Sequence, residues 1–256
     1  VELQKWFRKA QCFDSEGVYI LDQTHLVVPR NKSYEDAVFM PVDEFGQRYP
    51  GLDDMTEEER RALKWHPCYT LSTLLHLSYK KQAFHVAAYE FGPGNEDELP
   101  QARRLMQTFL KNHKKGSMKL LVDDQGYIFK EFIICINKEY TVYILIPLIK
   151  KIELHRDCVA MSEMPHADWV TVSQRGDEEN YKIVRACPIE NVPIWMECNA
   201  KLYTTVCEVE KTTGDDGGVQ INKFSLCSTR KFDTPSQVVD SYLLRSRTEE
   251  CFRQFK

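Results

Sequence analysis

The sequence lacks long runs of like charge and long apolar runs. Its 34 lysines and arginines and 38 aspartates and glutamates are interspersed, without a run of five like charges, and the formal net charge is −4. This balance gives no reason to expect nucleic acid as a partner. The longest apolar run, Val142–Ile149, contains a proline, so no segment is predicted to span a membrane. Charges occur throughout the first ten residues, so no signal peptide is expected there, although residue 1 is not methionine.

Closely spaced cysteine pairs are also absent. The nine cysteines include no C-x₂₋₄-C spacing, so a zinc site is not predicted. Their odd number and even spread are unlike a secreted disulfide framework and favour synthesis in a reducing compartment. The candidates for a disulfide between subunits are Cys12 and Cys251, near the two ends, and Cys187, within the string ACPIEN.

No catalytic constellation is recognisable. Cys68 stands close to His66, but the string Trp-His-Pro-Cys has no feature that activates a thiolate, so a structural histidine is favoured. The tripeptide 92–94, Gly-Pro-Gly, lacks the lysine of a phosphate loop, and the acidic pair 215–216 is interpreted as a hairpin tip. The sequence therefore predicts no catalytic, cofactor-binding or metal site. Catalytic residues that lie far apart in the sequence would escape this reasoning.

The apolar stretch 116–151 organises the predicted fold. It is interpreted as three consecutive strands, Met118–Val122, Tyr127–Ile136 and Tyr140–Ile149, joined by turns rich in Asp, Asn and Gly. Two of these strands lack polar alternation and must be covered on both faces. Two hairpins are predicted to follow, one around Gly176-Asp177 and one around residues 214–218. We expect the segment 116–235 to form an antiparallel β-sandwich with Ile134, Ile144 and Val184 in its core.

Helices are predicted in the first half and at the end of the chain. They comprise Glu2–Cys12, a helix from the capping box of Thr56 and Glu59, a second helix Tyr69–Tyr79, one that begins at Pro100, and one that begins at Thr234-Pro235. Between the first two, residues 18–28 are predicted to be a strand pair or a bent strand. The predicted fold class is α+β: an antiparallel β-sandwich core with N-terminal and C-terminal helices and a helical insertion at Asp43–His85. The chain is expected to be one domain, 1–256, with a helical region at 1–115, a sandwich at 116–235 and a C-terminal helix at 236–256.

Several strings occur in an order and spacing that resemble one known family. They are VYILDQTHL (18–26), FGPGN (91–95), SMKLLVDDQGYIFKE (117–131), NYKIVRACPIENV (180–192), IWMECNAKLYTTV (194–206) and KFSLCSTRKFDTP (223–235). Together they resemble the polyhedrin–granulin family of baculoviruses, insect viruses whose matrix proteins crystallise around virions as occlusion bodies. The insertion 43–85, a different C-terminal tail and the absence of the family's basic cluster indicate a distant member, of nudivirus type.

The resemblance implies a structural protein with no enzymatic activity or cofactor. It implies trimers built through the sandwich, a crystalline lattice around virions, and an intracellular, nuclear location. The candidate lattice contacts are Trp6, Trp65, Phe252 and Phe255, with Phe252 and Phe255 expected to be exposed. For Trp6 and Trp65 the open alternative is that they pack their own helices on the sheet. Because the charge of −4 grows as 12 tyrosines and nine cysteines ionise, the lattice should hold at neutral pH and dissolve in alkali.

Two other classes of function stay open at this point. An intracellular interaction domain would carry one exposed apolar patch. An enzyme of unrecognised class would carry a deep pocket with convergent polar groups.

Overall fold

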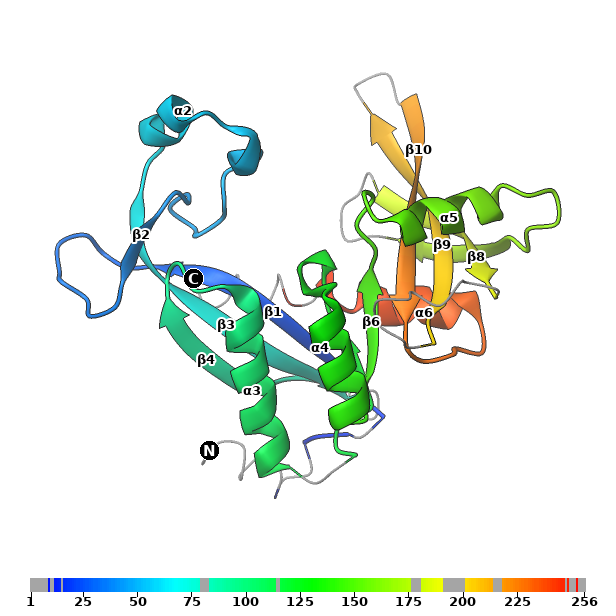
Figure 1. Cartoon of the computed structure of the whole chain (residues 1–256), viewed down its shortest axis with the longest axis horizontal. Coiled ribbons are helices and arrows are strands. Elements are labelled where there is room, and N and C mark those ends of the chain that lie inside the picture. Colours follow the sequence, from blue (N-terminus) through cyan, green and yellow to red (C-terminus); the bar gives the residue numbers. More distant parts are fainter. Residues whose placement is uncertain are drawn as a thin grey trace.

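The strands of this protein form one open, mixed sheet. The computed structural model describes residues 9, 12–14, 16–78, 83–113, 116–175, 181–190, 201–213, 218–246, 248 and 252. Within them, ten strands follow the order β2-β3-β1-β5-β6-β10-β9-β8-β7, and β4 pairs with β3. The portion of the sheet beyond β6 is turned steeply against the first portion, so that the molecule has two halves (Figure 1).

The first half contains the parallel strands of the sheet. β1 (Val18–Val27) pairs antiparallel with β3 (His66–Ser78) and parallel with β5 (Leu120–Val122), and β5 pairs parallel with β6 (Tyr143–Pro147). β4 (Ala83–Pro93) and the short β2 (Val38–Met40) both pair with β3, on the side away from β1. The segment with β2, the 3₁₀ turn Leu52–Asp54 and α2 (Glu57–Ala62) projects from this half (Figure 1).

The second half is a four-stranded antiparallel extension. Its strands are β7 (Val170–Arg175), β8 (Tyr181–Ile189), β9 (Tyr203–Thr213) and β10 (Gly218–Ser228). β10 joins the extension to the first half by pairing with β6. Both predicted hairpins, β7–β8 and β9–β10, are therefore confirmed, and their tips at 176–180 and 214–217 lie outside the described residues.

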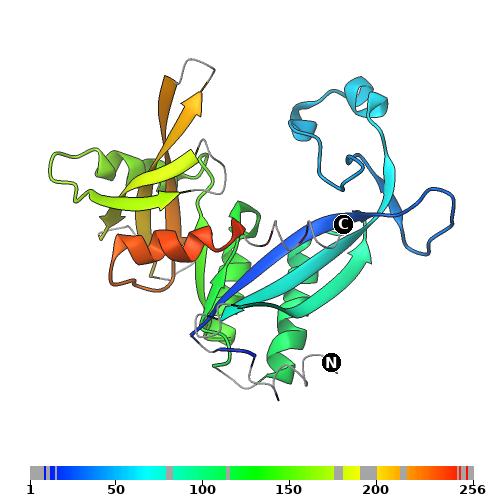
Figure 2. The same cartoon turned by 180° about the vertical axis from the view of Figure 1, so that it is seen from behind.

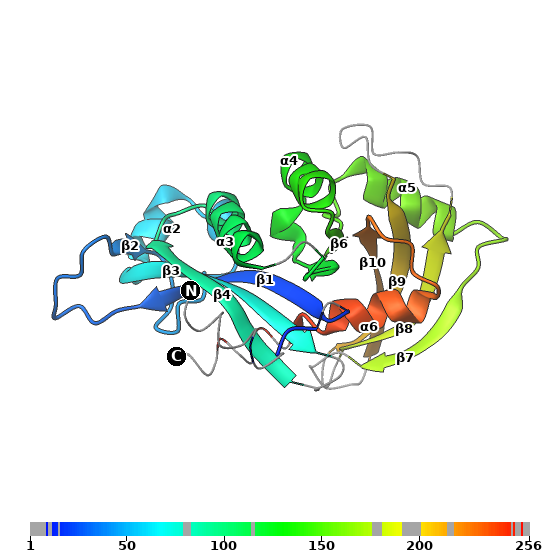
Figure 3. The same cartoon turned by 90° about the horizontal axis from the view of Figure 1, so that it is seen from below.

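Helices cover both faces of the sheet. α3 (Glu98–Asn112), α4 (Lys130–Ile134) and α5 (Glu153–Ser162) pack on one face, and α6 (Pro235–Leu243) packs on the other (Figures 2 and 3). Alternating side chains feed the two cores: Tyr19 and Leu21 of β1 face α3, while Val18 and Ile20 join the core under α6. The mixed α+β class is confirmed, with five α-helices among the described residues. The strands make one open sheet, and the expected sandwich is not confirmed.

The predicted strand Tyr127–Ile136 is wrong, because this segment is helical. A 3₁₀ turn (Gln125–Tyr127) leads into α4, which continues as a π-helical turn, Cys135–Glu139. The buried residues Ile128, Phe132 and Ile136 are spaced four apart, which is the spacing of one helix face, although β-branched residues suggested a strand. The topology also favours a helix, because parallel neighbours such as β5 and β6 need a crossover connection and such connections are usually helical.

The helix predicted at Tyr69–Tyr79 is also wrong, and with it most of the helical insertion. Residues 66–78 form β3, which lies between β1 and β4 and is buried along nearly its whole length. A strand buried on both faces shows no alternation, so its apolar content resembles that of a buried helix. The capping box of Thr56 and Glu59 is confirmed, but α2 ends at Ala62.

The three predicted core residues differ in their burial. Ile144 in β6 is buried, as expected. Ile134 lies near the end of α4 and Val184 at a β-bulge in β8, and both are only partly buried. The predicted helix Glu2–Cys12 lies largely outside the described residues.

Candidate functional site

Two aspartates lie close together just beyond the parallel pairing of β1 with β5, Asp22 in the middle of β1 and Asp124 in the turn after β5. Ile20 of β1 pairs with Val122 of β5, so continuing this register by two residues places Asp22 beside Asp124. Side chains two residues apart share a face of the sheet, and neighbouring strands are about 5 Å apart. Asp124 stands in the turn after β5, where its Oδ1 accepts a hydrogen bond of 2.7 Å from the N–H of Gly126. In open α/β sheets, ligands bind beyond the carboxyl ends of strands, which is where Asp124 lies.

An arginine from the far end of the chain joins the two aspartates. Arg245, two residues beyond α6, places its Nη2 3.4 Å from Oδ2 of Asp124. Its positive charge also lowers the pKa of Asp22, so it lies near both carboxylates. This one cation does not offset the effect of burial on the pKa of Asp22. Burial raises that pKa to about 7, and the charges of Asp124 and Glu98 add to the shift.

The neighbouring Asp123 is a buried carboxyl close to Asp22 and Asp124. Its side chain has 0% exposure. Burial raises its pKa well above the usual range, the charges of Asp124 and Asp22 add to the effect, and a hydrogen bond from the backbone N–H of Leu21 opposes it. A buried carboxyl beside two others marks a site that lacks positive charge.

Glu98 brings a further carboxylate to the same turn. It is the first residue of α3, and burial raises its pKa, with a further contribution from Asp124. A methyl group on Gly126 would lie 2.8 Å from Oε2 of Glu98 and 2.9 Å from Oδ1 of Asp124. Glycine at position 126 therefore lets both carboxylates approach one point of the backbone.

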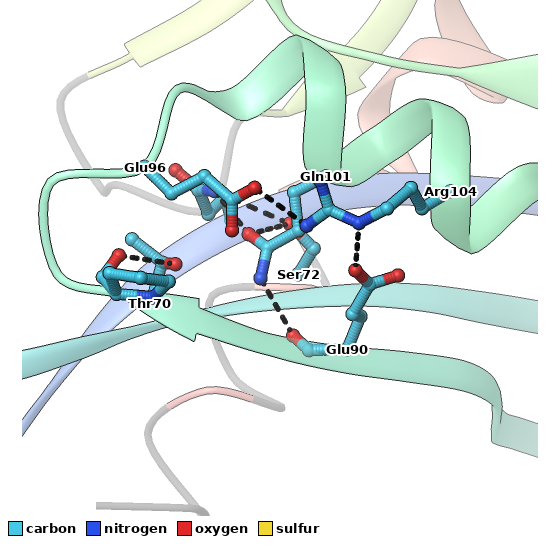
Figure 4. A network of polar contacts seen from close by, with 8 residues as sticks. Thr70, Ser72, Glu90, Glu96, Gln101 and Arg104 are labelled. Atoms are coloured by element: carbon cyan, nitrogen blue, oxygen red, sulfur yellow. Dashed lines mark hydrogen bonds and ion pairs between the residues drawn. The ribbon is translucent and has the colours of Figure 1, made fainter. Parts of the chain in front are cut away.

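A polar network holds α3, and with it Glu98, against the sheet (Figure 4). The buried Gln101 accepts a hydrogen bond of 2.7 Å from the hydroxyl of Ser72 and donates one of 3.1 Å to the carbonyl of Glu90. Arg104, one turn further along α3, bridges Glu90 and Glu96. Because these bonds tie the helix to β3 and β4, the position of its first residue is fixed relative to β1.

A groove lined with positive charge begins at Asp124. This basic groove has a volume of about 490 Å³, and its charged lining consists of Asp124, Lys150, Lys211, Lys223 and Arg245. Four of these five residues are cationic, in a chain whose net charge is −4. A second, larger cavity of about 1150 Å³ lies on the other side of the turn and shares Gln125 with the groove.

The residues singled out as lattice or disulfide contacts lie elsewhere and do not converge. Trp65, after α2, is 39% exposed, and its indole N–H donates to the carbonyl of Arg60 at 3.2 Å. Phe252 is 7% exposed, so the expectation that it is exposed is wrong. Cys187 is buried in β8, and Cys12 is partly buried. Trp6, Cys251, Phe255 and the acidic pair 215–216 lie outside the described residues.

The cysteine beside His66 is shielded in the fold. The Cys68 thiol is buried and donates to the carbonyl of His66 at 3.1 Å, and burial raises its pKa to about 11. A thiol with so high a pKa carries little thiolate at neutral pH, which fits the structural role inferred from the sequence.

The sequence reasoning missed the aspartates of this site. Asp22 ends the apolar string Val-Tyr-Ile-Leu, and Asp123 and Asp124 end the string Leu-Leu-Val. An aspartate directly after a short apolar run was the available signal. This signal indicates a site only once the structure shows that the two apolar runs are neighbouring strands.

Comparison with known proteins adds no relative. No family model, no curated protein and no solved structure matches this chain. No helix in the described portion of the chain is long and apolar enough to cross a membrane. Over the same residues, no group of three or more His, Cys, Asp or Glu side chains is arranged to hold a metal ion.

Proposed function

We propose that this protein is a metal-dependent enzyme that breaks or transfers phosphodiester bonds. Asp22 and Asp124 would hold a divalent cation, and the basic groove would hold the phosphates of the substrate. The observation that carries the proposal is the closeness of these two carboxylates, from adjacent parallel strands, with Asp124 also lining a groove that has four cationic residues. Polar groups that converge on one groove support an enzyme as the class of function.

The residues present fit magnesium. Mg²⁺ keeps several waters and is usually bound by one or two carboxylates together with substrate phosphates, so a site of three protein ligands is not required. Such a cation supplies Lewis-acid polarisation of the phosphate and an activated water. It would also neutralise the acidic cluster of Asp22, Asp123 and Asp124, in which two carboxyls have raised pKa values.

The groove supports a polymeric, negatively charged substrate. Lys150 and Lys211 line it together with Arg245, which also contacts Asp124. Lys223 is partly engaged, because its Nζ lies 3.0 Å from Glu163. Charged side chains of this kind contact phosphates without reading sequence, so we expect nucleic acid of any sequence to bind. The net charge of −4 hides this local concentration of positive charge.

The test combines Mn²⁺ binding with turnover. Labelled single-stranded and duplex oligonucleotides are incubated with the protein and Mg²⁺ or Mn²⁺, and bound Mn²⁺ is followed by its electron paramagnetic resonance signal. Asp22→Asn and Asp124→Asn should each lower cleavage at least 100-fold and weaken Mn²⁺ binding, whereas Asp54→Asn, at an exposed site, should change neither.

Two outcomes would contradict the proposal. If Mn²⁺ binding is absent, or is equal in all variants, the proposed metal site is wrong. Mn²⁺ binding that depends on both aspartates, without cleavage of any of these nucleic acids, would overturn the phosphodiester substrate and leave the metal site standing.

A matrix protein of viral occlusion bodies is the second candidate. It is supported by the sequence resemblance and by large apolar side chains on the surface, such as Val219 at 61% exposure and Ile221 at 59% on β10. Exposed apolar surfaces of this kind mark contacts with other molecules. An interaction domain would have such a surface too. Intracellular crystals in producing cells, with turbidity that clears in alkali, would favour this candidate. A soluble protein that cleaves nucleic acid would exclude it.

A further inference from the structure

The larger cavity, of about 1150 Å³, borders the candidate site. Gln23 and His25 of β1 line it, together with the loop before α3, the first turns of α3 and the turn after β5. It shares Gln125 with the basic groove and includes Gly126, two residues beyond Asp124. Its volume is comparable to that of small-molecule sites, which measure roughly 300–1,000 Å³. A substrate held at Asp124 therefore adjoins both the groove and this cavity.

The charge of the larger cavity is unlike that of the basic groove. Three consecutive carboxylates, at 96–98, line the cavity together with two arginines, Arg48 and Arg103. Arg48 is close enough to Glu98 to lower the pKa of that carboxyl. The groove has four cationic residues and one aspartate, so phosphates are favoured in the groove and disfavoured in the cavity. The part of a nucleotide that suits the cavity is the uncharged base, whose N–H groups can donate to carboxylates.

Phe129 is an aromatic residue whose place in the fold does not explain it. It is 48% exposed and lines the larger cavity. It is also the N-cap of α4, where serine, threonine, aspartate or asparagine is usual because the side-chain oxygen accepts from a helix N–H. Among the described residues, neither of the two cores includes it. An aromatic ring that neither caps the helix nor fills a core is suited to stack on a ligand.

Exposed amide side chains line the same cavity. They belong to Asn95, in the loop before α3, and to Gln125, in the turn after β5. An amide both donates and accepts hydrogen bonds, which matches the mixed donors and acceptors along the edges of bases. The larger cavity therefore combines an aromatic ring with polar groups for the edge of a base.

We propose that the larger cavity binds one unstacked base of a single-stranded nucleic acid, with the base stacked on Phe129 and its phosphate at Asp124. This inference rests on the proposed function and names the form of substrate that the site takes. Proteins that bind single strands stack bases on aromatic side chains in this way, and every base has a face that can stack. The bases of a duplex are paired and stacked, so a duplex would contact the groove alone.

Binding of three labelled ligands tests the base site. They are a single strand, the same strand with abasic sites in place of its bases, and the duplex, each followed by fluorescence anisotropy in EDTA. All proteins carry Asp124→Asn, which stops the proposed cleavage and keeps an acceptor for the N–H of Gly126. Adding Phe129→Ala should weaken binding of the intact single strand about tenfold. Affinity for the abasic strand and for the duplex should not change.

Two further variants and one control separate stacking from general effects. Phe129→Leu keeps an apolar side chain but has no ring, so it should weaken binding of the intact strand as Phe129→Ala does. Phe129→Trp should retain the affinity, because it keeps a ring. Phe45→Ala removes a ring that is 59% exposed and outside the cavity lining, and it should change none of the three affinities. Circular dichroism checks that each variant is folded.

Three results would overturn the base site. They are an intact strand that does not bind, an intact strand that binds equally with and without Phe129, and an equal loss for all three ligands. The cleavage assay with Asp22→Asn and Asp124→Asn judges the proposed function separately. Cleavage that needs both aspartates without selective loss in Phe129→Ala would leave the proposed function and refute the base site. Selective loss in Phe129→Ala without any cleavage would refute the proposed chemistry and support the base site.

Discussion

Single residues at the candidate site are constrained by close approach. Gly126 admits Glu98 and Asp124 because it has no Cβ, whereas Gly51 has φ +71° and no atom within 4 Å of the position that a methyl group would take. We expect Gly126→Ala to displace the carboxylates and weaken Mn²⁺ binding at least tenfold. Gly51→Ala should lower the free energy of unfolding by about 1 kcal/mol through backbone strain and leave Mn²⁺ binding unchanged. Parallel Mn²⁺ titrations and denaturant melts measure both effects, and equal Mn²⁺ affinity in the two variants would contradict this role of Gly126.

The buried His76 should make the protein sensitive to acid. Its Nε2 accepts a hydrogen bond of 2.9 Å from the backbone N–H of Asp14, and burial together with the charge of His85 lowers its pKa to about 4. Since the unfolded pKa is near 6.5, the stabilisation is complete above pH 6.5 and is lost as pH falls toward 4, by about 3 kcal/mol at most. Denaturant melts from pH 8 to 4 should show this slope in the wild type and a flatter one in His76→Gln. The exposed His166→Gln serves as the control, and an unchanged slope in His76→Gln would refute the assignment.

At the scale of elements, two helix caps of similar chemistry should differ in effect. Thr56 caps α2, which buries no residue, and Thr234 caps α6, which buries Val238 and Val239. Losing a cap costs about 1 kcal/mol of helix stability. We therefore expect Thr234→Ala to lower the global free energy of unfolding by about that amount. Thr56→Ala should only speed amide exchange in residues 57–62, and a global loss in Thr56→Ala would show that α2 is coupled to the core.

Local signals predicted the elements that local chemistry determines. The caps at Thr56 and Thr234, the helix α3 and both hairpins followed from capping residues, periodicity and turns. The parallel β1-β5-β6 unit did not, because β1 and β5 are about one hundred residues apart and the crossover helix α4 between β5 and β6 has a strand-like composition. The candidate site was missed for the same reason. It exists only through the register of β1 against β5.

At the scale of the whole molecule, local charge should outweigh net charge. If the four cations of the basic groove contact phosphates, the logarithm of duplex affinity should fall with the logarithm of salt concentration at a slope of about −3 to −4. Lys150→Gln and Lys211→Gln should each reduce the slope by about 1. Lys64→Gln, outside the groove, should leave it unchanged. Fluorescence anisotropy between 50 and 300 mM salt gives these slopes, and a slope near zero would remove the groove from nucleic-acid binding.

The contact between Arg245 and Asp124 spans 121 residues and has a consequence for biosynthesis. A ribosome adds about 5–20 residues per second, so the arginine follows the aspartate by about 6 to 24 seconds. During that interval the nascent chain can pair β1 with β3 and β5, yet α6 and its arginine are still missing. If the proposed phosphate chemistry needs Arg245, it would start only after this residue has left the ribosome and α6 has packed on the sheet. Activity in the nascent chain would therefore be delayed by the position of Arg245 in the sequence.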